Sequence, residues 1–149
     1  MTSAPRIPRA GRIIAADWGE VRIGVALSDE TQLLASPLTT LVRRPGKRFP
    51  MQRFLDLVAT HHPVGIVVGL PLTGEGDEGD SAIAARELGD AMARRTGLPL
   101  YLQDERMSSA RALGAIREQG GSTRGRREEV DALAAAILLQ QFLDRRRNE

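Results

Sequence analysis

Three acidic residues in this sequence have the types and positions for metal-dependent chemistry: Asp17, Glu105 and Asp131. Asp17 ends an apolar run at 13–16, which predicts a buried strand. Glu105 follows an extended stretch predicted at 98–102. If these two strands are parallel neighbours, both carboxylates emerge at the same edge of the sheet.

Asp131 lies in the first turn of a helix predicted at 128–144. Ala134, Ala135 and Leu138 follow it at helical spacing and form an apolar stripe of mostly small residues. Because such a stripe packs against the sheet, Asp131 should point toward the sheet and away from water.

A cluster of these three acids predicts a metal site. Carboxylates within about 5 Å of one another repel by about 1–4 kcal/mol per pair, and a divalent cation removes that repulsion. Ligand sets made only of oxygen select Mg²⁺ or Mn²⁺ over zinc. Two such ions about 4 Å apart can cleave a phosphodiester bond. We therefore predict Asp17, Glu105 and Asp131 as catalytic residues and as ligands of a two-ion site.

Each acid also has a purely structural interpretation. Asp17 could cap a hairpin turn, and Glu105 could pair with Arg106 at the surface. Asp131 could interact favourably with the helix dipole. The joint arrangement of the three favours the metal site.

The elements that would position these acids follow from hydrophobic periodicity and turn residues. Pro37 places the third strand at a sheet edge. The predicted elements are strands at 13–16, 22–27 and 33–42, a helix at 47–61, a strand at 64–69, a helix at 81–95, a strand at 98–102, and helices at 108–118 and 128–144. This order predicts an α/β protein with a mixed five-stranded sheet flanked by helices, as in the ribonuclease H-like fold.

Composition sets the limits of the prediction. The 149 residues suit one domain, expected at 12–144 between a flexible N-terminal tail at 1–11 and a C-terminal tail at 145–149. The absence of cysteine excludes disulfides and thiolate zinc sites and suits a cytoplasmic protein. No apolar stretch approaches the roughly 20 residues of a membrane span, so we expect no membrane partner. Lys47 is the only lysine among 21 basic residues, which reflects either genome composition or selection of arginine for phosphate contacts.

Four sequence blocks together resemble one family. The blocks are Asp17-x-Gly19-x-x-Arg22-Ile23-Gly24-Val25-Ala26-x-Ser28-Asp29, Val67-Val68-Gly69-Leu70-Pro71, Asp104-Glu105-Arg106-Met107-Ser108 and Val130-Asp131-Ala132-Leu133-Ala134-Ala135. They are similar to the YqgF/RuvX family of pre-16S rRNA nucleases, which are related to the RuvC Holliday-junction resolvases.

The resemblance implies a ribonuclease H-like nuclease domain, a divalent-metal site and a role in maturing the 5′ end of 16S rRNA. It implies that Asp17, Glu105 and Asp131 are the catalytic acids, with Asp104 as an alternative to Glu105.

Arginines near the acids are candidates for nucleic-acid binding. Arg22 and Arg106 flank the acids and could pair with them or bind the scissile phosphate. Arg124, Arg126 and Arg127 belong to a basic loop before Asp131 that could hold phosphates, or could be a solvated surface loop. The expected partner is structured RNA such as pre-16S rRNA, or branched DNA, and the sequence gives no indication of oligomeric state.

Two other functions compete with an RNA nuclease. One is a Holliday-junction resolvase-like DNA nuclease, and the other is a non-catalytic RNA-binding factor for ribosome assembly. An actin- or hexokinase-type nucleotide fold opens with a similar hairpin, but it needs two such domains where 149 residues supply one.

Overall fold

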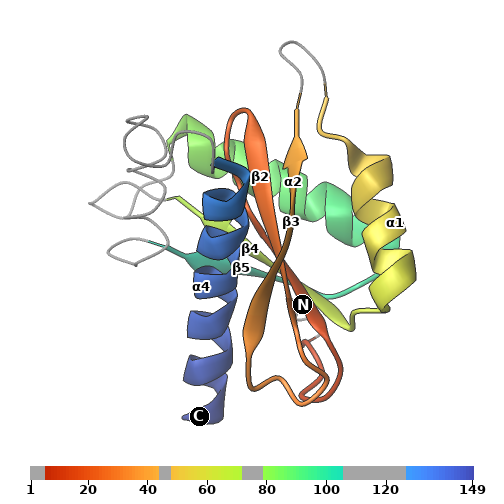
Figure 1. Cartoon of the computed structure of the whole chain (residues 1–149), viewed down its shortest axis with the longest axis vertical. Helices are drawn as coiled ribbons and strands as arrows, with labels where there is room; N and C mark the ends of the chain where they lie inside the picture. Colours follow the sequence, from red (N-terminus) through yellow and green to blue (C-terminus); the bar gives the residue numbers. More distant parts are fainter. Residues whose placement is uncertain (1–5, 44–47, 72–78, 106–126) are drawn as a thin grey trace, which may run out of the picture.

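The computed structural model describes residues 6–43, 48–71, 79–105 and 127–149. Within these ranges the chain forms five strands and three helices (Figure 1). In order they are β1 (Ile13–Asp17), β2 (Arg22–Ser28), β3 (Ala35–Val42), α1 (Met51–His61), β4 (Gly65–Leu70), α2 (Asp80–Thr96), β5 (Leu100–Asp104) and α4 (Arg127–Arg147). The helix predicted at 108–118 lies outside the described residues.

The strands form one mixed sheet in the order β3-β2-β1-β4-β5. The pairs β1–β2 and β2–β3 are antiparallel, whereas β4 is parallel to both β1 and β5. The predicted five-stranded mixed sheet and the edge position of β3 are thus confirmed. Pro37 lies beside a register shift between Val25 and Ala26, where the missing N–H disturbs the ladder least.

The expectation that β1 and β5 are neighbours is wrong, because β4 lies between them. All six residues of β4 are buried. A strand with no polar side chain is suited to the centre of a sheet with both faces covered. The acids at the ends of β1 and β5 must therefore approach each other across β4.

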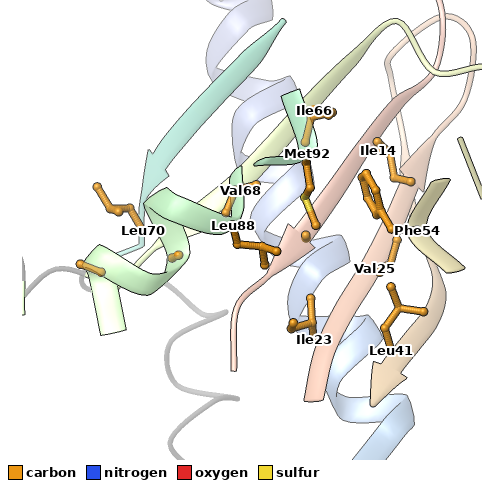
Figure 2. Close-up of a cluster of buried hydrophobic side chains, with 13 residues drawn as sticks. Ile14, Ile23, Val25, Leu41, Phe54, Ile66, Val68, Leu70, Leu88 and Met92 are labelled. Carbon is orange, nitrogen blue, oxygen red and sulfur yellow. The ribbon is translucent and has the colours of Figure 1, made fainter. Parts of the chain in front are cut away.

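Two hydrophobic clusters cover the two faces of the sheet. The first joins α1 and α2 to one face, and Figure 2 shows Phe54 and Met92 reaching the same cluster as Ile14 and Val25. The second cluster joins α4 to the other face (Figure 1) and contains Ile13. Because side chains alternate along a strand, every second residue of β1 faces α4.

Prolines explain where two elements begin. The helix predicted from residue 47 begins at Met51, directly after Pro50, because proline is tolerated only at a helix start. The strand predicted from residue 98 begins at Leu100, after Pro99, and continues to Asp104.

The N-terminal segment packs against the end of α4. Ile7 is only 7% exposed, and Gln32 Nε2 donates a 2.8 Å hydrogen bond to the Pro8 carbonyl oxygen. At the other terminus α4 continues to Arg147, and Arg146 Nη2 donates a 2.6 Å bond to the Ile7 carbonyl oxygen. Residues 6–11 and the end of α4 thus hold each other in place. Among the described helices we find none whose length and apolar character would let it cross a membrane.

Candidate active site

Asp17 is the last residue of β1 and is almost completely buried, at 3% exposure. It follows Ile13 and Ala15 on the alternating face of β1 that packs against α4. Its cross-strand partner is Gly24 of β2. The sheet therefore delivers this carboxylate to a covered position, where desolvation is costly.

Asp131 belongs to the first part of α4 and has 0% exposure. Its backbone presses directly on β2: a Cβ added to Gly24 would lie 1.8 Å from the Asp131 carbonyl oxygen. Only glycine permits this approach. Because Gly24 pairs with Asp17, the start of α4 lies next to the end of β1.

Arg22 secures the Asp131 carboxylate. Its Nε–H donates a 2.7 Å hydrogen bond to Asp131 Oδ2, and the Arg22 side chain is 19% exposed. Charge-assisted bonds of this kind are the strong ones, and here the bond offsets part of the desolvation of a buried anion. Arg22 was predicted either to pair with an acid or to bind the scissile phosphate, and in the structure it pairs with Asp131.

Glu105 follows the last residue of β5 and is 6% exposed, whereas Asp104 is exposed. A Cβ added to Gly69 would lie 2.8 Å from Glu105 Oε2, so the carboxylate occupies the space above this glycine. Gly69 is one residue beyond Val68, the partner of Ala16 in β1. Because Gly69 has no side chain, the Glu105 carboxylate lies over β4 and extends toward the end of β1.

Three buried carboxylates from distant segments therefore lie on the α4 side of one end of the sheet. Their all-oxygen donor set is the kind that Mg²⁺ and Mn²⁺ prefer. In this conformation, however, no group of three His, Cys, Asp or Glu side chains among the described residues is placed to hold a metal ion. The donor chemistry fits a divalent cation, and in this conformation Asp131 pairs with the positive charge of Arg22.

Most of the other predicted site residues lie outside the part of the chain that the structure describes. Arg106, Arg124 and Arg126 are not among the described residues, and Arg127 is the first residue of α4. Sequence reasoning missed the packing roles of Gly24 and Gly69. Their signal was present, because a glycine inside a strand often marks a close approach by another group.

The comparisons with known proteins agree on one family. A family model described as "RuvX: Holliday junction resolvase" matches residues 11–145. A Roseiflexus protein named "Putative pre-16S rRNA nuclease" is 40% identical over 137 residues, covering 92% of this chain and 96% of that protein. A protein of the same name from Anaeromyxobacter dehalogenans is 42% identical over 135 residues, covering 91% and 98%.

A solved structure shares the fold. Thermus thermophilus RuvC, solved in complex with a Holliday junction substrate, matches with a TM-score of 0.54 and 18% identity. The match covers 92% of this chain and 96% of that one. The ribonuclease H-like fold expected from the order of elements is thus confirmed.

Proposed function

Because this chain belongs to the RuvX family, we propose that it is a metal-dependent endonuclease that processes the 5′ end of pre-16S rRNA during ribosome biogenesis. One observation carries the proposal: Asp17, Glu105 and Asp131 are each at most 6% exposed at the same end and face of the sheet. Carboxylates that distant segments bring to one face of a sheet supply oxygen ligands of the kind that Mg²⁺ and Mn²⁺ prefer. The pre-16S rRNA substrate is taken from the names of the relatives.

Asp17, Glu105 and Asp131 are the residues that would hold Mg²⁺ or Mn²⁺, in a two-ion arrangement as predicted. When bound, such ions polarise the scissile phosphate and lower the pKa of an attacking water molecule.

The chain itself supplies the rigidity that this chemistry needs. Asp17 is fixed within the sheet, and Asp131 is held by the close contact of its backbone with Gly24. Arg22 orients the Asp131 carboxylate through Oδ2, and a carboxylate has a second oxygen that can serve as a ligand. Preorganised groups of this kind contribute to catalysis because they do not have to reorganise during the reaction.

Substrate binding rests on predictions from the sequence. Arg106, Arg124, Arg126 and Arg127 stay the predicted phosphate contacts, together with Arg22. The proposed partner is structured RNA, and the proposed location is the cytoplasm.

The test is cleavage of an RNA that carries the 5′ leader of 16S rRNA, with Mg²⁺ or Mn²⁺ present. We expect the wild type to cleave it and Asp17→Asn to be at least about 100-fold slower, since even residues that only support metal ligands contribute 10–100-fold. The matched control is Asp56→Asn, which changes an exposed acid on α1 and should cleave like the wild type.

Two results would overturn the proposal. Equal cleavage by the wild type and Asp17→Asn would remove the acids from the chemistry. Cleavage of a four-way DNA junction but not of the RNA would assign the DNA-resolvase alternative instead.

A further inference from the structure

A pocket lies at the opposite end of the sheet from the three acids. It has a volume of about 710 Å³ and lies between the N-terminal segment, the start of β5 and the end of α4. Its lining includes Arg6, Arg9, Tyr101, Phe142, Arg146 and Glu149. We call these six residues the end pocket. Asp131 and Arg146 are fifteen residues apart on α4, which is about 22 Å along the helix axis.

The end pocket carries an excess of positive charge. Three of its six named residues are arginines, and Glu149 is the one acid among them. Arg9 Nη2 pairs with Glu149 Oε2 at 3.2 Å, but both side chains are more than half exposed, so the pair is weak. Arg146 donates to the Ile7 carbonyl oxygen, a neutral acceptor that leaves its charge in place. Burial, and then the charge of Arg9, lower the pKa of Arg146, as expected where cations are crowded.

Aromatic rings form the apolar part of the same pocket. Tyr101 is 40% exposed, and its ring lies 5.1 Å, centroid to centroid, from the ring of Phe142. The Arg145 guanidinium lies 5.4 Å from the Tyr101 centroid, and its Nη2 donates a 3.0 Å bond to the Tyr101 hydroxyl. These contacts hold an exposed aromatic ring in a fixed position beside the arginines.

Arginines beside a fixed, exposed ring match one class of ligand. Guanidinium groups bind phosphate through paired N–H donors, and bases of any sequence stack on aromatic rings. The volume also falls within the 300–1,000 Å³ that is typical of sites for small ligands.

We propose that the end pocket binds a nucleotide unit, with the phosphate on the arginines and the base against Tyr101. The occupant we favour is a single-stranded part of the RNA substrate, which makes the pocket a second anchor away from the acids. This choice of occupant rests on the proposed function, whereas affinity for a nucleotide unit does not. A free mononucleotide offers the same chemistry and is the other source that the test distinguishes.

The test is the affinity of a fluorescently labelled single-stranded RNA oligonucleotide, measured by anisotropy in EDTA so that no cleavage occurs. Tyr101→Leu keeps an apolar contact with Phe142 and should weaken binding about 5- to 150-fold, the range for loss of one stacked base. Arg6→Gln with Arg9→Gln should also weaken binding and reduce its dependence on salt. The matched control, Arg53→Gln, removes an exposed arginine from α1 and should bind like the wild type.

Each outcome decides the proposal. Wild-type affinity in both Tyr101→Leu and Arg6→Gln would overturn it, as would an absence of binding by the wild-type protein. If the variant that combines Arg6→Gln with Arg9→Gln fails to fold, Arg6→Gln alone is measured in its place, because Arg6 is exposed. If free AMP displaces the oligonucleotide from the wild-type protein, the occupant is assigned as a free nucleotide. If the variants lose binding while the wild type cleaves no RNA in Mg²⁺ or Mn²⁺, the pocket stands and the proposed function fails.

Discussion

Gly24→Ala severely perturbs the contact between α4 and the sheet. The added Cβ would lie 1.8 Å from the Asp131 carbonyl oxygen and 2.4 Å from its carbonyl carbon. An ordinary contact between carbon and oxygen is about 3.3 Å, so α4 and β2 must separate by about 1.5 Å. Both partners are backbone, and no side-chain rotation can relieve the clash.

The separation should reduce both stability and activity. Overpacking costs about 1–3 kcal/mol, and a clash between two backbones belongs at the upper end of that range. For a domain of this size, about 3 kcal/mol lowers Tm by roughly 6–12 °C. A displacement of about 1 Å at a catalytic group can cost about 100-fold in rate, so RNA cleavage should fall by at least that factor.

The assays are thermal unfolding by circular dichroism and single-turnover cleavage of the 16S leader RNA. Gly89→Ala in α2 is the matched control, because the atoms nearest to its Cβ would belong to the side chains of Leu100 and Leu102, at 3.2–3.3 Å. The gain of about 1 kcal/mol in helix propensity offsets that tight contact, so Tm should stay within about 3 °C. A Gly24→Ala protein with the Tm and cleavage rate of the wild type would refute the close packing of α4 on β2.

Two further perturbations test separate parts of the structure. Gly69→Ala would place a Cβ 2.8 Å from Glu105 Oε2 and displace that carboxylate. We therefore expect cleavage to fall about 10- to 100-fold, with a smaller loss of Tm than in Gly24→Ala. An unchanged cleavage rate would contradict the position of Glu105. The pKa of Asp29 is lowered from 3.8 to about 2, mainly because its carboxylate accepts hydrogen bonds from the Thr31 hydroxyl and then from the Leu34 N–H. Desolvation has the opposite effect and raises the pKa, but it is smaller than these bonds together. The stabilisation by ionised Asp29 is therefore complete above about pH 4 and is lost as the pH falls through 2. Carboxyl ¹³C NMR should give a midpoint near 2 that rises in Thr31→Val, and a wild-type midpoint near 3.8 would disprove the hydrogen-bonded turn.

The sequence was sufficient to predict the elements that the structure describes and the burial of two acids within them. The apolar run that ends at Asp17 became β1, and the small-residue stripe after Asp131 packs on the sheet as expected. Both predictions succeeded because hydrophobic periodicity directly reports which face of an element is buried. The role of these acids as metal ligands stays a prediction.

The arrangement of strands was harder to predict, because it depends on contacts between distant segments. Nothing local to Asp17 or Glu105 indicates that β4 lies between their strands. The route from Glu105 toward β1 depends on the missing side chain of Gly69, and this becomes visible only when the register of three strands is known. The packing of Ile7 against the end of α4 was missed for the same reason.

The most direct test of the central claim compares two adjacent acids, Glu105 and Asp104. Glu105 is buried at the site, and Asp104 is exposed one residue earlier. In single-turnover cleavage of the 16S leader RNA with Mn²⁺, Glu105→Gln should lose at least about 100-fold, whereas Asp104→Asn should retain a rate within a few-fold of the wild type. Both variants lose one negative charge at nearly the same place, so a general electrostatic effect would slow them equally. A Glu105→Gln protein that cleaves at the wild-type rate, or a larger loss in Asp104→Asn, would contradict the account.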